Sequence, residues 1–276
     1  REENFLVSPR NPLSAGSSTH GKTRGRGTVG LKYFQFIFFQ HPDFWQIFRN
    51  TLLINFYKLL IGFPTPIILA LILNELRNLT FKKTVQTSLY LPHFVSWVVL
   101  GGIVVQFLSP TDGVLNQIIR ALGGESTYFL AEPRYFRGVV AVTHTLKTAG
   151  WGTIIYLAAL ANVDPELYDA ATIDGASRLQ QTWHVTIPGI AETIVFLLLL
   201  NIGQLMRVGF EQIYVLYNPA VYSTGDVIMT YVYRVGLGSG RFSLTTAIGM
   251  FQSVVGAILL LSANGLSRRF FDRSIW

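Results

Sequence analysis

Long apolar runs separated by shorter polar segments make up most of the chain beyond residue 50. Five of these runs approach or exceed the roughly 20 residues that a helix needs to cross the hydrocarbon core of a bilayer. They cover residues 51–73, 89–108, 136–161, 190–208 and 244–266. The pattern predicts an all-α, polytopic helical membrane protein with a transmembrane domain over residues 31–276.

Composition agrees with this prediction. Half of the 276 residues are hydrophobic and 13% are charged, whereas soluble proteins carry roughly 25% charged residues. The net charge of +7 fits Lys and Arg side chains near lipid headgroups. We expect no nucleic acid partner, because no basic stripe with interleaved aromatic residues occurs. Cysteine is absent and the five histidines lack ligand spacing, so we expect no metal site.

Residues 1–30 form a polar, basic segment that we interpret as a flexible N-terminal tail. Residues 16–23 match the phosphate-loop pattern GxxxxGK[ST]. That loop binds phosphate only where it joins a buried strand to the N-terminus of a helix. Neither neighbour is indicated here, so we do not expect this segment to bind ATP.

A polar stretch over residues 164–188 separates the third and fourth apolar runs. Asp164 can cap a helix whose first residue is Pro165, and Gly175 suits the end of that helix. Ser177 can cap a second short helix, and Pro188 opens the next apolar run. The stretch therefore predicts a helix, a tight turn and a second helix at the membrane surface.

This stretch resembles the EAA loop of the membrane subunits of ABC importers. The loop has Glu-Ala-Ala, three residues, Gly, and later Ile-Pro; here Asp169 replaces the Glu and keeps its charge. Further segments are similar to oligosaccharide permeases of the carbohydrate-uptake class. They are Arg49-Asn50-Thr51, Tyr90-Leu91-Pro92-His93 and residues 150–156, 173–177, 209–212 and 232–236.

The resemblance implies a multi-pass permease subunit in the inner membrane of a bacterium, surrounded by membrane lipid. Its implied partners are a second, homologous permease subunit, an ATPase dimer and an extracytoplasmic solute-binding protein. The implied substrate is a carbohydrate, and an acidic one such as alginate is the single best guess. The chain would be no enzyme and would bind no cofactor itself, because ATP and Mg would bind to the ATPase.

The same resemblance implies how the ATPase acts on this chain. The polar stretch would lie in a cleft of the ATPase, where small alanine side chains let the helix sink in. ATP-driven closure would push the stretch as a rigid lever and tilt the neighbouring spans. The residues expected to couple the two subunits are Glu166, Asp169, Ala170, Ala171, Asp174, Gly175, Ile187 and Pro188.

Polar residues inside the apolar runs are candidates for the translocation path. Asn201 and Gln204 are three residues apart and share a helix face, and Arg207 extends that face with a group suited to an anionic sugar. Lys147 in the third run and Tyr231, which lies between the fourth and fifth runs, are further candidates. The alternatives are hydrogen bonds between helices for Asn and Gln and interface anchoring for Tyr.

Lys58 lies inside the first apolar run. A charged residue there faces either the bundle interior or a water-filled path, or its side chain extends along the helix to the membrane surface. The sequence leaves both alternatives open.

Two questions about the whole protein also stay open at this stage. A secondary transporter or channel without an ATPase would explain the apolar runs, although not the EAA-like loop. If the EAA-like loop is cytoplasmic, five spans place the basic N-terminal tail on the outer side of the membrane. The positive-inside rule disfavours that placement, because it expects Lys and Arg on the cytoplasmic side. Because such subunits generally have six core helices, we expect one N-terminal span to be absent from the chain.

Overall fold

Helices form all the regular structure in the part of the chain that this computed structural model describes, residues 29–207 and 209–271. No strand occurs within those ranges. The N-terminal tail and its GxxxxGK[ST] pattern lie outside the described residues. The predicted all-α class is therefore confirmed.

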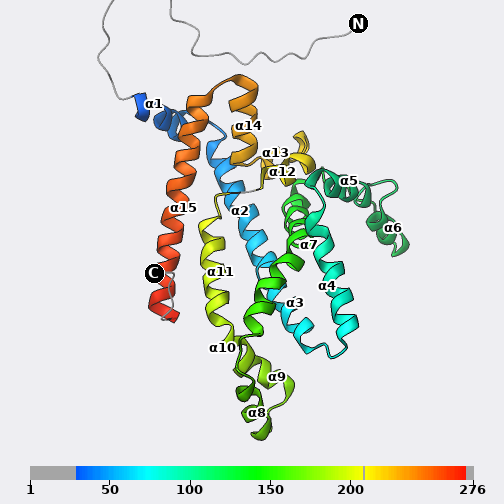
Figure 1. Cartoon of the computed structure of the whole chain (residues 1–276). Helices are drawn as coiled ribbons and strands as arrows, with labels where there is room; N and C mark the ends of the chain where they lie inside the picture. The colour runs from blue at the N-terminus through cyan, green and yellow to red at the C-terminus, as the bar shows by residue number, and fades with distance from the viewer. Residues whose placement is uncertain (1–28, 208, 272–276) are drawn as a thin grey trace, which may run out of the picture.

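A bundle of long helices forms the body of the molecule (Figure 1). Helix α2 (Phe44–Gly62) continues into α3 (Pro64–Glu75), and α7 (Pro133–Leu160) packs along both. Helix α4 (Leu79–Phe94) packs on α7, while α11 (Ala191–Gly203) packs against α15 (Phe242–Phe271). The helices α2–α3, α7 and α15 confirm the predicted first, third and fifth runs as helical.

Short elements occupy the two ends of the bundle (Figure 1). One end, which we call the hairpin end, holds α8 (Pro165–Ile173), α9 (Arg178–Gln181), a π-helical turn η2 (Thr182–Thr186) and α10 (Ile187–Gly189). The opposite end, which we call the far end, holds α1 (Val29–Gln35), η1 (Phe36–Gln40), α5 (Trp97–Phe107), α6 (Val114–Ala121), α12 (Phe210–Leu216), η3 (Pro219–Val221), α13 (Tyr222–Gly225) and α14 (Ile228–Ser239).

The predicted single span over residues 89–108 is wrong. Helix α4 begins ten residues earlier, at Leu79, and ends at Phe94, and α5 then leaves it at an angle of 102°. Ser96 caps α5 by accepting a hydrogen bond from the Val99 amide at 3.3 Å. The buried ammonium group of Lys147 donates hydrogen bonds to the carbonyls at the C-terminal end of α4. These bonds stabilise the sharp bend, because they satisfy backbone groups that the bend leaves without a helical partner.

The fourth predicted run is shorter than expected as a helix. Helix α11 has 13 residues and ends at Gly203, so it rises only about 20 Å. The chain is not helical at Arg207, and α12 starts at Phe210. The prediction of a continuous helix to residue 208 is therefore wrong, because the chain unwinds near the middle of the bundle.

Length and hydropathy alone select two single helices that could cross a membrane within the described ranges. They are Phe44–Glu75 and Phe242–Arg269; the bent pairs α4–α5 and α9–α11 pass only when each is taken as one span. Helix α7 is 28 residues long but more polar, because it contains Thr143, Lys147 and Thr153. These three side chains are buried against neighbouring helices. The division into a tail and a five-span domain stays a prediction.

Side chains at the far end join α2 to α7, α13 and α14. Asn50 accepts a hydrogen bond from the Arg137 guanidinium at 2.8 Å and donates to the Asp226 carbonyl at 3.1 Å. Thr51 Oγ1 accepts from the Ile228 amide at 3.0 Å. Buried polar groups with partners of this kind specify one packing arrangement, so the Arg49-Asn50-Thr51 segment fixes how the far end closes over the bundle.

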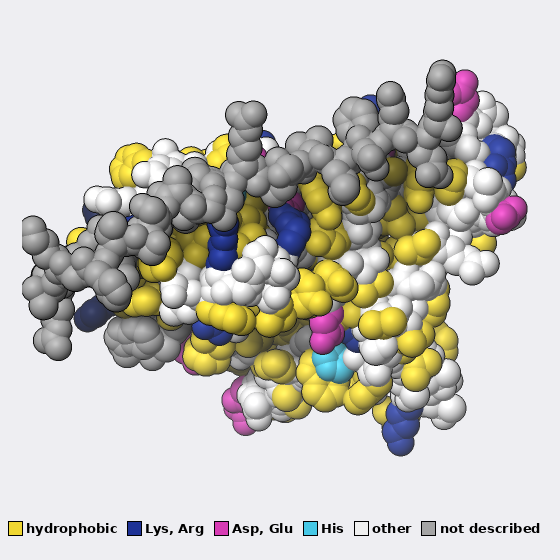
Figure 2. All heavy atoms as spheres, turned by 90° about the horizontal axis from the view of Figure 1, so that it is seen from above, with side chains coloured by type: hydrophobic (Ala, Val, Ile, Leu, Met, Phe, Trp, Pro, Cys, Tyr) yellow, Lys and Arg dark blue, Asp and Glu magenta, His cyan; other side chains and the backbone are white. Residues whose placement is uncertain are grey.

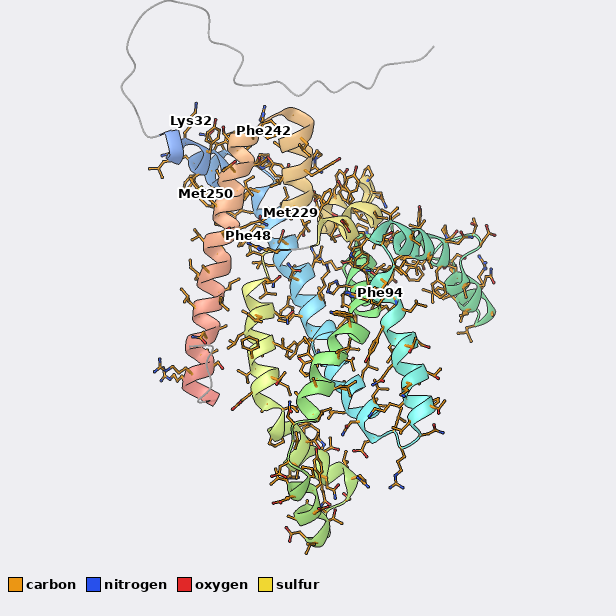
Figure 3. The ribbon with its side chains drawn as sticks, viewed as in Figure 1. Lys32, Phe48, Phe94, Met229, Phe242 and Met250 are labelled. Atoms are coloured by element: carbon orange, nitrogen blue, oxygen red, sulfur yellow. The ribbon has the colours of Figure 1, made fainter. Side chains whose placement is uncertain are left out.

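Aromatic rings attach α15 to the start of α2. Phe251 lies 5.2 to 5.6 Å from the ring centroids of Phe38, Phe44 and Phe48, and Figure 3 shows Phe48 between the two helices. Seen from the far end, apolar side chains also reach much of the visible surface (Figure 2). Only 22% of the apolar window of each single spanning helix is buried inside the chain, as expected where lipid or another subunit covers the rest.

The contact between α4 and α7 depends on Gly150, where an added Cβ would overlap the carbonyl oxygen of Leu89. We expect Gly150→Ala to destabilise the fold by about 1–3 kcal/mol through overpacking and to lower the midpoint of thermal unfolding in detergent. Gly138 lies in the same helix with open space around it, so Gly138→Ala is the control and should leave the midpoint unchanged or raise it. Equal midpoints for the two variants would contradict this packing.

Candidate functional site

The polar stretch over residues 164–188 folds into the predicted hairpin. Asp164 caps α8 by accepting a hydrogen bond from the Glu166 amide at 2.9 Å, and Pro165 is the first helical residue. Gly175 has a φ of +76°, a conformation that favours glycine. Ser177 and Gln180 form a capping box that starts α9. Local sequence signals therefore set the helix starts and the turn of this hairpin.

Hydrogen bonds between side chains make the hairpin one stiff unit. The Gln181 amide group donates to Thr172 Oγ1 at 3.0 Å and to the Ala176 carbonyl at 3.2 Å. The Tyr168 hydroxyl donates to Thr186 Oγ1 at 3.1 Å. These contacts tie α8 to α9 and η2, so a force on one arm of the hairpin reaches the other.

A shallow cavity of about 440 Å³ opens on the hairpin surface. Four of the residues predicted to contact an ATPase line it, namely Ala170, Ala171, Asp174 and Gly175. Glu166 and Asp169 are exposed on the same helix outside the lining. Ile187 and Pro188 belong to α10, at the base of the hairpin. The structure thus groups the first six predicted residues on the hairpin and leaves the last two at its root.

Large apolar side chains on the hairpin were missed by the sequence reasoning. Ile173 is 87% exposed, Leu179 69% and Trp183 62%. Large apolar side chains exposed together on so small a unit are typical of a protein interface rather than a free surface. Their signal in the sequence was the presence of bulky apolar residues within an otherwise polar stretch.

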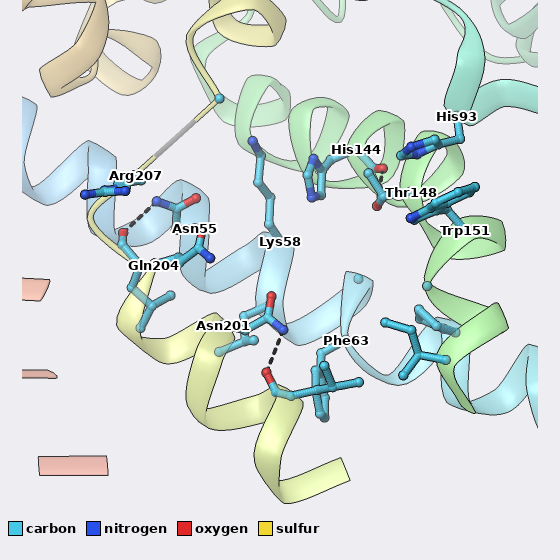
Figure 4. A pocket seen from close by; sticks show the side chains of 18 of the residues that line it. Asn55, Lys58, Phe63, His93, His144, Thr148, Trp151, Asn201, Gln204 and Arg207 are labelled. Atoms are coloured by element: carbon cyan, nitrogen blue, oxygen red, sulfur yellow. Dashed lines mark hydrogen bonds between the residues drawn. The ribbon is translucent and has the colours of Figure 1, made fainter. Parts of the chain in front are cut away.

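A second cavity, of about 410 Å³, lies in the bundle between α2, α3, α7 and α11 (Figure 4). Asn201, Gln204 and Arg207 line it together, although Gln204 and Arg207 lie beyond the end of α11 and not on the helix face that the sequence predicted. Its other polar lining residues were not in the predicted set: they are Asn55, Lys58, His93, His144, Thr148, Trp151 and Tyr156. Helices far apart in sequence contribute them, so no local pattern could have grouped them.

Buried amide side chains hold the unwound chain beside this cavity. Asn55 on α2 donates to the Leu205 carbonyl at 2.6 Å, and Gln252 on α15 donates to the Met206 carbonyl at 2.9 Å. Irregular backbone at membrane depth is tolerated where its polar groups find such partners and line a cavity. On the opposite wall, the ring of Trp151 stacks on His93 with centroids 4.6 Å apart.

Lys147 and Tyr231 lie away from this cavity. The Lys147 ammonium donates to the carbonyls of Pro92, His93 and Val95 at the end of α4. The Tyr231 hydroxyl makes a 2.6 Å hydrogen bond with His41 Nε2 at the far end, where burial lowers the pKa of His41 below its ordinary value. The structure brings together three of the five predicted path residues and gives the other two structural contacts.

No cluster of three or more His, Asp or Glu side chains able to hold a metal ion occurs in residues 29–207 and 209–271.

Comparison with known proteins agrees with this arrangement. Residues 62–273 match the family model described as "Binding-protein-dependent transport system inner membrane component". Protein LplB of Bacillus subtilis is 46% identical over 248 residues, covering 90% of this chain and 78% of LplB. The polygalacturonan/rhamnogalacturonan transport permease YteP of the same organism is 44% identical, covering 91% and 78%.

Solved structures extend the comparison to the fold. A crystal structure of a bacterial ABC transporter involved in the import of the acidic polysaccharide alginate matches with a TM-score of 0.83 and 43% identity, covering 89% of this chain and 85% of that chain. A structure of a bacterial alginate ABC transporter with an alginate-bound periplasmic protein matches equally well, with a TM-score of 0.83 and 42% identity. It covers 90% of this chain and 88% of that one.

These matches favour an importer over the alternative of a secondary transporter or channel. The relatives are permease subunits, which are not enzymes themselves. The chain belongs to the family of binding-protein-dependent transport system inner membrane components, the membrane permeases of ABC importers.

Proposed function

We propose that this permease carries an oligosaccharide through the bundle cavity into the cytoplasm, driven by an ATPase dimer that grips the hairpin. The observation that carries the proposal is the direct connection between hairpin and cavity. Helix α7 leads into the hairpin and α11 leads out of it. Ile155 and Tyr156 of α7, and Leu197 and Asn201 of α11, line the cavity.

The hairpin has the properties that a coupling element needs. It is stiff, exposed, and carries a cavity beside small alanine side chains together with large apolar side chains. A displacement of such a unit is passed to α7 and α11, which would open or close the cavity. ATP and Mg would bind to the ATPase, so this chain needs no cofactor of its own.

The proposed substrate is an acidic oligosaccharide. The two charged side chains that line the cavity among the described residues, Lys58 and Arg207, are basic. The comparisons support the same class, because one similar structure is an alginate transporter and YteP is named for polygalacturonan. A confined cavity lined by one sign of charge concentrates ligands of the opposite sign.

The orientation and partners follow from the same proposal. The hairpin end would face the cytoplasm, so the far end would receive the extracytoplasmic solute-binding protein. A second permease subunit would cover the open side of the cavity. The complex of a similar transporter with its periplasmic protein supports this arrangement.

The hairpin's turn should be essential for coupling. Gly175→Val forces a branched side chain into a positive-φ position, and Asp169→Lys reverses a charge on α8. We expect either variant to insert normally and to reduce substrate-stimulated ATPase activity of the purified complex to its basal rate. Gly123→Val, at a position with φ of +83° near α6, is the matched control and should keep the stimulation. Full stimulation in both hairpin variants would refute the coupling role.

The exposed apolar side chains of the hairpin should hold the ATPase. We expect Ile173→Glu to abolish co-purification of the ATPase with the permease, because it places a charge at the centre of an apolar contact. Leu122→Glu changes a side chain that is 84% exposed at the far end, compared with 87% for Ile173. That control should retain the ATPase, and loss of the ATPase in both variants, or in neither, would argue against a hairpin interface.

A further inference from the structure

Lys58 is a buried cation in the middle of a membrane-spanning helix. The helix runs over Phe44–Glu75, so Lys58 is about 21 Å from one end and about 26 Å from the other at 1.5 Å per residue. Its side chain is 7% exposed and borders the bundle cavity. Because the side chain is buried inside the bundle and borders the cavity, it does not extend along the lipid-facing surface of the helix towards the headgroups.

Lys58 has no partner within the described ranges of the chain. No hydrogen bond involves its ammonium group, and the one salt bridge found among those residues joins Arg234 to Asp226. The other buried lysine, Lys147, is 9% exposed and donates to three backbone carbonyls. Lys147 therefore stabilises the fold, whereas nothing in the described fold compensates the charge of Lys58.

The walls around Lys58 add no counter-charge. No Asp or Glu appears among the described residues that line the cavity, and the second charged group there is Arg207. Figure 4 shows the Lys58 side chain extending between Asn55 and His144. The Asn55 amide nitrogen donates to the Leu205 carbonyl, so this hydrogen bond does not involve Lys58. A buried, unpaired charge is costly in a membrane and is retained where it serves a function.

The cavity also offers a surface for a sugar ring. Trp151 lines it and stacks flat on His93, with an interplanar angle of 8°. Such a platform contacts the apolar face of a pyranose, while an ammonium group can donate several hydrogen bonds to a carboxylate. An oligosaccharide built of uronic acid units carries both features along its length.

We propose that Lys58 is the specificity-determining residue that binds the carboxylate of a uronic acid unit as the oligosaccharide passes through this subunit. The proposal rests on the function proposed above and narrows it to one contact. The carboxylate supplies the counter-charge that the fold omits, so an acidic sugar stabilises the occupied cavity and its neutral counterpart does not.

The test uses the full complex of two permeases and the ATPase dimer, purified in nanodiscs without the binding protein. Oligogalacturonate and the same oligomer with its carboxyl groups reduced are titrated while tryptophan fluorescence reports binding. We expect Lys58→Gln to weaken binding of the acidic oligomer about tenfold or more and to leave that of the reduced one unchanged. Lys58→Arg should retain the preference for the acidic oligomer.

Stability separates this role from a structural one. Lys58→Gln and Lys58→Met should unfold at or above the wild-type temperature, because they remove an uncompensated charge. Lys147→Gln is the matched control: it should lower that temperature and weaken binding of the two oligomers equally. The proposal is overturned if Lys58→Gln binds the acidic oligomer as tightly as wild type. It is also overturned if the Lys58 variants lose the second permease, since an acidic residue of that subunit would then be the partner.

The two proposals fail differently. If the wild-type complex with its binding protein imports no oligosaccharide, acidic or neutral, the proposed function fails. If it imports oligogalacturonate and Lys58→Gln does so with an unchanged KM, only the role of Lys58 fails.

Discussion

The fold depends on one constraint: where a helix breaks inside the bundle, side chains must satisfy the backbone groups that the break releases. Two of the breaks in the described residues border the cavity. At the end of α4, the Lys147 ammonium binds the released carbonyls. After α11, Asn55 and Gln252 bind the carbonyls of Leu205 and Met206. These partners are buried, so they hold the described backbone on both sides of the cavity in place.

The cavity lies between these two breaks, which explains its chemistry. His93 at the end of α4 lines one side, and Gln204 and Leu205 of the unwound segment line the other. An uninterrupted helix would present only side chains there. The breaks bring polar groups to the cavity, and α7 adds His144 and Thr148 to its lining. A permease needs this combination, because a sugar must find hydrogen-bond partners at a depth where lipid offers none.

The hairpin is stabilised by local contacts, whereas the cavity is formed by helices that are far apart in the sequence. Its shape comes from caps and a glycine turn within 25 residues, and its exposed apolar groups are left for another subunit. The far end is instead built from long-range contacts such as Asn50 with Asp226 and Arg137. The hairpin end thus takes its shape from residues close together in the chain. The far end forms only when segments far apart in the sequence come into contact.

The sequence by itself determined the helical class and the hairpin with its caps at Asp164 and Ser177, because these depend on residues close together in the chain. Only the tertiary structure decided where α4 bends and where α11 stops. The bend is stabilised by Lys147, which lies 52 residues beyond Val95, and the stop by Asn55, which lies 150 residues before Leu205. A hydropathy pattern contains no information about these distant partners. The prediction therefore joined parts of α4 and α5 into one span and continued α11 beyond its end. For the same reason two buried lysines that look alike in the sequence differ in the fold: Lys147 has carbonyls within reach, and Lys58 faces a cavity.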